Sequence, residues 1–80
     1  MRTEFEYIFF EELSSTGKMR RWRCRNKRSK NNLGLVEWAR GWRQYTWRPE
    51  PFTEYSSGCM GDIKAFLDAA NAERGKEVGQ

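Results

Sequence analysis

The spacing of hydrophobic residues changes once along this chain, and that change limits the folds it can adopt. Between residues 18 and 27 the side chains alternate, with a ring and a thiol on one side and only cations on the other, the period of a half-buried β-strand. From residue 59 onward, apolar residues recur at i, i+4, i+7, i+8 and i+11, one stripe of an amphipathic helix. The pattern therefore predicts extended structure followed by one helix.

Aromatic and β-branched residues, with turn residues between them, define the expected strands. These are residues 5–12, 18–27, 33–38 and 42–48. A turn cluster at 14–17 and a polar, basic loop at 28–32, where Asn31 and Asn32 tolerate left-handed conformations, separate the first three strands. A tight connection at 39–41 joins the last two in a hairpin. Pro49 and Pro51 should end the fourth strand, because proline cannot donate to a ladder.

The helix is expected to follow Ser56 or Ser57, either of which can cap its start, with Asp62 in its first turn. Gly75 can end it. Its apolar stripe consists of Cys59, Ile63, Phe66, Leu67 and Ala70. The fold class predicted is α+β: a four-stranded antiparallel meander with one C-terminal helix packed on one face. Residues 1–75 form the single domain, and residues 76–80 form a frayed tail.

Eighty residues hold only a small core, which must be built from large side chains, and the four Trp, five Phe and three Tyr supply them. Tyr45 and Trp47 are expected in that core, under the helix. No apolar run reaches the roughly 20 residues of a membrane span, and the N-terminus lacks a secretory pattern. We therefore expect a cytoplasmic protein in which Cys24 and Cys59 are free, buried thiols.

Charge is distributed unevenly along the chain. Residues 18–48 carry eleven Lys or Arg against Glu37 alone, a net of +10, whereas the segments before and after each carry −3. A basic centre between acidic ends is suited to steering an acidic partner onto one surface.

The residues needed for common catalytic sites are missing. The chain has no histidine, so a Ser-His-Asp arrangement and a Cys-His pair are excluded. Two cysteines alone cannot complete a zinc site, and the glycines match neither nucleotide-binding fingerprint. Cys59 near a helix start could have a lowered pKa, but nothing nearby can act as its base. We therefore expect a protein that is not an enzyme and that has no cofactor and no metal.

Six cations and no carboxylate occupy residues 21–30. Arginine favours forked contacts to carboxylate or phosphate, which suggests a binding surface. The alternative is a solvated sheet face whose charges serve solubility and protect an edge. At the later hairpin, Trp38 or Trp42 is expected to be partly exposed, where either can stack on bases or on the cations of Arg40 and Arg43. The predicted partner-binding residues are Arg20, Arg21, Arg23, Arg25, Lys27, Arg28, Lys30, Arg40 and Trp42.

About half of the chain carries a motif of aromatic residues and a Cys-led helix. It consists of Leu33-Gly34-x-Val36-x-Trp38, Trp42-Arg43-Gln44-Tyr45-x-Trp47-x-Pro49, and Cys59-Met60-x-Asp62-Ile63-x-x-Phe66-Leu67 with Asn71. This motif resembles that of small uncharacterised proteins encoded by phages and prophages. Proteins of that size and origin commonly bind and block host machinery, and anti-CRISPR proteins are a prominent group among them.

The resemblance implies a phage-derived, non-catalytic inhibitor in the host cytoplasm, most simply an anti-CRISPR protein that blocks a nucleic-acid-handling effector. The basic sheet face would contact the effector protein or its guide RNA. The alternative is a small phage nucleic-acid-binding accessory protein, with the same arginines on phosphates and Trp38 or Trp42 against bases. The partner is then a CRISPR–Cas effector or a nucleic acid. No membrane is involved, and the chain is a monomer or a weak homodimer.

Overall fold

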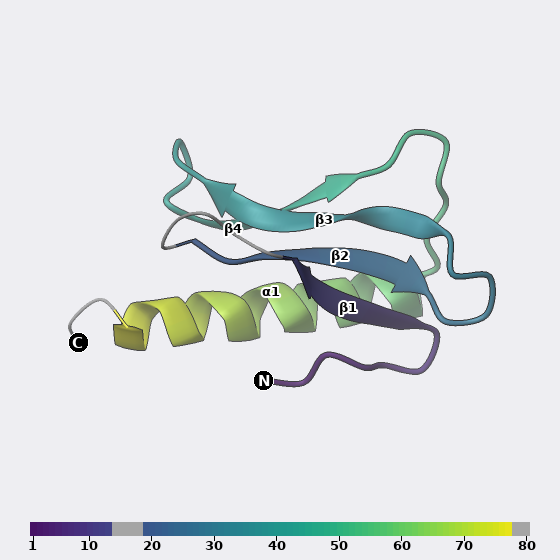
Figure 1. The fold of residues 1–80 in the computed structure, drawn as a ribbon, viewed down its shortest axis with the longest axis horizontal. Helices are drawn as coiled ribbons and strands as arrows, with labels where there is room; N and C mark the ends of the chain where they lie inside the picture. The colour runs from purple at the N-terminus through teal and green to yellow at the C-terminus, as the bar shows by residue number, and fades with distance from the viewer. Residues whose placement is uncertain (14–18, 78–80) are drawn as a thin grey trace.

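The computed structural model describes residues 1–13 and 19–77 and confirms the predicted α+β fold (Figure 1). Four antiparallel strands form one open sheet in the order β1-β2-β3-β4, and a single helix follows them. The elements are β1 (Ile8–Leu13), β2 (Arg21–Asn26), β3 (Asn32–Ala39), β4 (Gln44–Pro49) and α1 (Ser57–Glu77). The predicted turn at 14–17 and the predicted start of the second strand at residue 18 lie outside the described residues.

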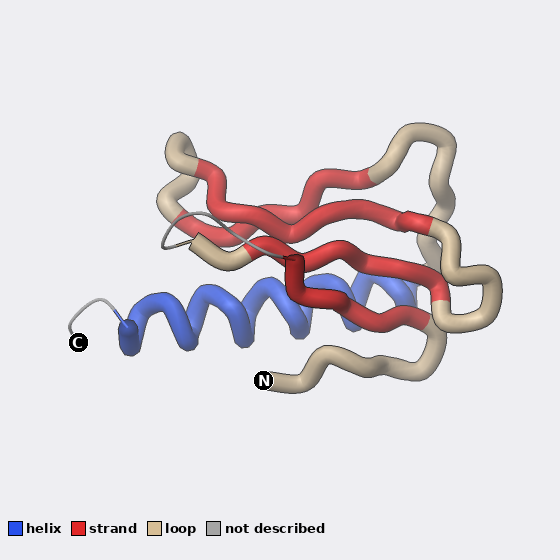
Figure 2. The backbone as a smooth tube through the Cα atoms, in the orientation of Figure 1, coloured by secondary structure: helices blue, strands red, loops and turns tan. Residues whose placement is uncertain are grey.

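The helix lies across one face of the sheet, and the opposite face has no second layer among the described residues (Figure 2). The core between them is aromatic, as the composition predicted. The ring of Phe66 stacks on Phe10 with centroids 3.9 Å apart and meets Trp22 edge-on at 5.2 Å. Trp22 and Phe66 are each only 1% exposed. Each buried ring removes roughly 150–250 Å² from water, so these few contacts supply much of the folding energy.

The alternation predicted for the second strand is confirmed. Trp22 and Cys24 point toward the helix and are buried, whereas Arg21, Arg23 and Arg25 lie on the other side. The predicted core positions in β4 are also confirmed, because Tyr45 is 4% exposed and Trp47 packs against the core cluster.

The first strand is shorter than predicted, beginning at Ile8 instead of residue 5. The chain before it folds back: the amide of Phe5 donates to the carbonyl of Ile8 at 2.9 Å, and the amide of Phe10 donates to Thr3 at 2.8 Å. This reversal turns the ring of Phe5 into the core, where it meets Phe10 edge-on. Aromatic alternation continues through the bend, and therefore could not mark it.

The fourth strand also starts later than predicted, at Gln44 instead of residue 42. The amides of Trp42 and Arg43 both donate to the carbonyl of Ala39, at 3.2 and 2.8 Å, which closes a four-residue turn. Arg43 has a φ of 55°, in the left-handed region that is costly for a residue with a Cβ. Trp42 therefore lies in the turn and is 74% exposed, as expected of one of the two hairpin tryptophans.

Ser56, one of the two serines expected to cap the helix, does so, with its Oγ accepting a hydrogen bond from the amide of Cys59 at 3.1 Å. The predicted apolar stripe packs into the core. Two details of the predicted helix were wrong. Because the helix starts at Ser57, Asp62 falls beyond the first turn. Gly75 does not end the helix: its φ is not left-handed, and α1 continues to Glu77, so the predicted tail begins inside the helix.

The β2–β3 turn uses a different asparagine from those expected. The side-chain oxygen of Asn26 accepts hydrogen bonds from the amides of Arg28 and Ser29, at 2.9 and 3.0 Å. The left-handed residue is Lys30, with a φ of 65°.

Within the described residues, no helix is both long and apolar enough to cross a membrane.

Candidate functional site

The sheet surface facing away from α1, here called the open sheet face, carries the predicted arginine row of β2. Strand register places Glu11 of β1 directly opposite Arg23, and Leu35 of β3 on its other side. Arg48 of β4 lies opposite Leu35, so Glu11, Arg23, Leu35 and Arg48 follow one another across the four strands. The row of cations is therefore interrupted on both sides by other kinds of side chain.

Carboxylates compensate two of the arginines on this face. Nε of Arg25 lies 3.0 Å from a carboxylate oxygen of Glu11, and Arg48 forms an ion pair with Glu37. Arg25 also donates to the carbonyl of Lys30 at 3.1 Å. Arg23 forms no ion pair or hydrogen bond through its guanidinium within the described residues. The open sheet face consequently presents arginines already arranged around carboxylates, with Arg23 available between them.

Arg20 lies on the helix side of the sheet, in line with the predicted alternation. Its guanidinium binds Glu12 at 2.8 Å and Glu73 of α1 at 3.2 Å, and it lies over the ring of Trp22. The hydrogen bond from Arg20 lowers the pKa of Glu12 below its usual value, and the same bond raises the pKa of Arg20. Arg20 therefore ties β1, β2 and α1 together.

The remaining predicted residues lie at opposite ends of the sheet. At the β2–β3 turn, Lys27 donates to the carbonyl of Phe5 at 2.9 Å, Lys30 lies 5.3 Å from the ring centroid of Phe9, and Arg28 is exposed. Arg40 and Trp42 lie in the β3–β4 turn. The structure thus divides the nine predicted residues among the open sheet face, the helix side and two separate turns.

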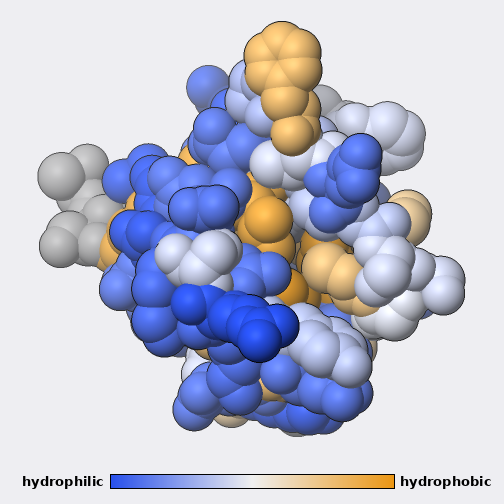
Figure 3. Space-filling model, turned by 90° about the vertical axis from the view of Figure 1, so that its right-hand side faces the viewer, coloured by the Kyte–Doolittle hydropathy of each residue, from blue (hydrophilic) through white to orange (hydrophobic). Residues whose placement is uncertain are grey.

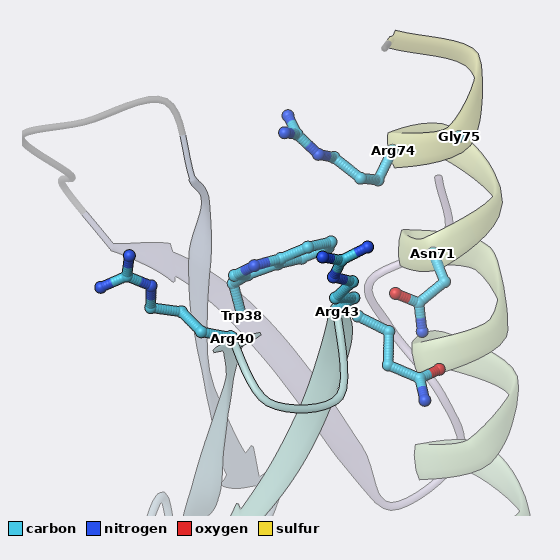
Figure 4. A pocket seen from close by; sticks show the side chains of 7 residues that line it. Trp38, Arg40, Arg43, Asn71, Arg74 and Gly75 are labelled. Atoms are coloured by element: carbon cyan, nitrogen blue, oxygen red, sulfur yellow. The ribbon is translucent and has the colours of Figure 1, made fainter.

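A second cationic feature lies where the β3–β4 turn meets the last part of α1. This hollow, here called the arginine pocket, has a volume of about 690 Å³. Figure 4 shows Arg74 reaching from the helix on one side of the indole of Trp38, with Arg43 beside the far end of the ring and the side chain of Arg40 directed away from it. Its lining consists of Trp38, Arg40, Arg43, Gln44, Asn71, Arg74 and Gly75.

The arginine pocket differs from the open sheet face in having no carboxylate among the described residues that line it. The guanidinium of Arg74 lies 5.3 Å from the centroid of the Trp38 ring, a cation–π distance. The guanidinium groups of Arg40 and Arg43 make no hydrogen bond or ion pair with any described residue. Three arginines therefore line one hollow with a flat aromatic ring.

Asn71 fixes the distance between the two walls of the pocket. Its side-chain oxygen accepts a hydrogen bond from the amide of Tyr45 at 2.7 Å, and its Nδ2 donates to the carbonyl of Tyr45 at 3.3 Å. The carboxamide thus pairs with the outer edge of β4 as a neighbouring strand would. The edge-on contact of Trp38 with Tyr45, with centroids 5.4 Å apart, fixes the indole in turn.

Sequence reasoning did not assemble this pocket. Arg74 and Asn71 were absent from the predicted binding residues. Trp38 was predicted only as one of two possible base-stacking rings, and Arg43 only as its possible cation–π partner. A signal was present, since Leu67, Asn71 and Arg74 follow the i, i+4, i+7 spacing and so share a helix face with a residue of the apolar stripe. Polar residues that extend an apolar stripe are candidates for contacts across the fold.

Two further hollows lack comparable chemistry. One, of about 360 Å³ between β4 and α1, is almost entirely apolar, and Lys64 is its charged member. The other, of about 450 Å³, lies where the start of α1 meets Tyr7 and Leu33. Figure 3 shows hydrophobic side chains in a hollow at that end of the molecule, surrounded by hydrophilic ones.

The cysteines are free and buried, as predicted. Burial raises the pKa of Cys24 to about 12, with a further contribution from Cys59, and burial also raises the pKa of Cys59. Both thiols therefore stay protonated at neutral pH. Because only the thiolate is a good nucleophile, both cysteines are poor nucleophiles at that pH. The described residues include no group of three or more potential metal ligands.

Comparisons with protein-family models, with curated proteins and with solved structures found no match.

Proposed function

We propose that this chain is a non-catalytic inhibitor that binds a protein component of a nucleic-acid-handling complex through its open sheet face. The observation that carries the proposal is the alternation of arginines with carboxylates on that face, where Arg25 pairs with Glu11 and Arg48 pairs with Glu37. A guanidinium held in this geometry can exchange its intramolecular carboxylate for one on a partner.

The same alternation makes a nucleic acid a poorer fit to the open sheet face. A phosphate backbone laid across the strands would approach Glu11 and Glu37 as well as the arginines, and like charges repel it. A protein surface of mixed charge can place its own cations opposite these two carboxylates. Leu35 and Phe9, both half-buried on this face, add the apolar contact that protein interfaces also use.

The partner we propose is the effector of a bacterial defence system, most simply a CRISPR–Cas effector. The resemblance of the chain to small phage-encoded proteins supports this choice, and the charge pattern of the open sheet face is compatible with it. A phage accessory protein that binds nucleic acid through the same arginines is the competing function.

An interference assay tests the proposal. Bacteria with an active CRISPR–Cas system that targets a phage would express the chain, and plating of the phage would be measured. We expect the chain to restore plating against at least one system type, and Arg21→Ser/Arg23→Ser/Arg25→Ser to abolish the effect. Full protection by a folded triple variant would contradict the proposal, as would failure of the unmodified chain against every system type.

The control and the competing function need separate measurements. Arg23→Gln and Lys64→Gln each remove one positive charge, from a half-buried arginine and an exposed lysine, and Lys64 lies on the helix, away from the open sheet face. We expect Arg23→Gln to abolish the protection of the phage and Lys64→Gln to leave it unchanged. If four to six cations of this face bound phosphates, nucleic-acid affinity would fall about 10²–10³-fold between 50 and 200 mM salt. Such a slope, lost in the triple variant, would favour the competing function.

A further inference from the structure

The arginine pocket combines three features that together specify one class of ligand. These are the indole face of Trp38, the guanidinium groups of Arg40, Arg43 and Arg74, and the side-chain amide of Gln44. An aromatic ring stacks on the indole, phosphate oxygens bind the guanidiniums, and an amide can hydrogen-bond the edge of a base. A carboxylate-bearing peptide would use the cations and leave the indole face unused.

We propose that the arginine pocket binds a nucleotide, with its base stacked on Trp38 and its phosphate held by Arg43, toward which the side chain of Arg40 turns on binding. Arg74 lies over the indole at 5.3 Å and comes from a different element than the other two arginines. Its side chain swings outward to admit the base and then covers the outer face of that base. The base is thus held between an indole and a guanidinium, both of which favour stacking.

The charge in the pocket supports an anionic ligand even though the end of a helix lies nearby. The C-terminus of a helix acts as about half a negative charge, and its effect fades beyond the last turn. Three guanidiniums outweigh it. Glu73, which precedes Arg74 in the sequence, binds Arg20 at 3.2 Å and the N-terminal amine at 3.7 Å, so its charge is compensated elsewhere.

Apart from the side chains of Arg40 and Arg74, the pocket is also fixed in place before any ligand arrives. Asn71 joins the helix to β4 through two hydrogen bonds, and the indole of Trp38 packs edge-on against the buried ring of Tyr45. Arg43 is held by a backbone hydrogen bond in a left-handed conformation within the turn. A site fixed in this way loses less conformational entropy when it binds than a flexible one does.

The ligand chemistry can come from two sources, a free nucleotide or the unpaired end of a nucleic-acid chain. Both present a base and a phosphate. The site is independent of the proposed inhibition, because it does not use Arg21, Arg23 or Arg25. A variant of one region therefore leaves the other intact, and the two proposals can fail separately.

A nuclear magnetic resonance titration of the uniformly ¹⁵N-labelled chain tests the proposal. The four indole N–H signals would be assigned with Trp→Phe variants, and the chain would be titrated with adenosine 5′-monophosphate, ribose 5-phosphate, a single-stranded oligoadenylate and a blunt DNA duplex. We expect saturable shifts of the Trp38 indole and the Gly75 amide with the mononucleotide, at a Kd of order 1 mM. Ribose 5-phosphate, which lacks a base, should bind about tenfold more weakly because it cannot stack.

The two sources are separated by the oligonucleotide. Binding of the oligoadenylate at least tenfold tighter than the mononucleotide, at the same signals, identifies the end of a chain as the ligand. Equal affinity identifies the free nucleotide. Equal binding of ribose 5-phosphate and the mononucleotide would overturn the proposal, as would a Trp38 signal that no nucleotide shifts.

Variants confirm that the shifts report the pocket. Arg74→Gln should weaken mononucleotide binding about tenfold, and Arg74→Lys, which keeps the charge but loses the planar guanidinium, should have an intermediate effect. Lys64→Gln, on the same helix and with the same change in charge, should leave the affinity unchanged. Equal weakening by Arg74→Gln and Lys64→Gln would show that net charge alone attracts the ligand, which would overturn the proposal.

Discussion

The open sheet face and the arginine pocket are both rich in arginine, but they offer a partner different charge. On the sheet, cross-strand register brings Glu11 and Glu37 among the arginines of β2 and β4. In the pocket, Arg40, Arg43 and Arg74 line one hollow with Trp38, and no carboxylate is among the described residues of that lining. The number of cations in a segment therefore does not tell where an anion binds. We expect an anion to bind where the fold brings several cations together without a carboxylate among the described residues.

The two regions share β3, so the largest effect should come from disturbing that strand. A Cβ on Gly34 would lie 2.5 Å from the ring of Trp47 and 2.7 Å from the backbone oxygen of Arg48. Gly34→Ala should destabilise the fold by about 3 kcal/mol, because a packed ring and a backbone carbonyl cannot both move aside. Urea unfolding measures the change.

Gly61→Ala provides the contrast. A Cβ at this position in the helix interior would meet no atom within 4 Å. The substitution should therefore stabilise the fold by about 0.5–1 kcal/mol, because alanine loses less conformational freedom on folding than glycine. If Gly34→Ala were as stable as the unmodified chain, the packing described between β3 and β4 would be wrong.

The next effect should separate the two regions, because Asn71 supports the pocket and not the open sheet face. Asn71→Ala leaves the amide of Tyr45 without its partner and should cost about 1–3 kcal/mol. At a temperature where this variant is still folded, its nucleotide affinity should fall while its activity in the interference assay persists. Parallel loss of both activities would show that the regions are not independent.

Removing the carboxylates should make the open sheet face resemble the pocket. Glu11→Gln/Glu37→Gln leaves Arg25 and Arg48 without acidic partners. If the two freed arginines contact two more phosphates, the slope of log oligonucleotide affinity against log salt concentration should steepen by about 1.5. Loss of each surface ion pair should lower the stability of the fold by at most about 1 kcal/mol. Fluorescence anisotropy with a labelled oligonucleotide at 50 and 200 mM salt measures the slope. An unchanged slope would mean that the carboxylates do not decide what this face binds.

The smallest effect concerns acid stability. The pKa of Glu12 is lowered by its hydrogen bond to Arg20, so this pair stabilises the fold above the ordinary pKa of a glutamate, near 4.3. That contribution should be lost as the pH falls through the lower pKa of the folded state. Because both side chains are partly exposed, it should amount to less than about 1 kcal/mol.

Glu12→Gln should flatten the dependence of unfolding free energy on pH below about 5, relative to Glu6→Gln at an exposed site. The same loss of pH dependence in both variants would contradict the role assigned to the Arg20 pair.

Residue periodicity predicted most of the fold and less of the site. Alternation in β2 and the stripe of α1 are local patterns that survive folding, so the meander, the helix and the cap at Ser56 followed from them. The reversal at Phe5 and the late start of β4 depend on backbone hydrogen bonds to Thr3 and Ala39, which no side-chain pattern encodes. The arginine pocket joins a turn to a helix about 30 residues away along the sequence, and contacts across the fold, such as that of Asn71 with β4, bring them together.

One measurement tests the comparison most directly: mapping backbone and indole N–H shifts of the unmodified chain during titration with a single-stranded oligonucleotide in 50 mM salt. If uncompensated cations decide where an anion binds, the first shifts should appear at Trp38, Gln44 and Gly75, and the amides of Arg21, Arg23 and Arg25 should follow only at higher concentration. Early shifts along β2, with the signals of the arginine pocket unmoved, would contradict the account.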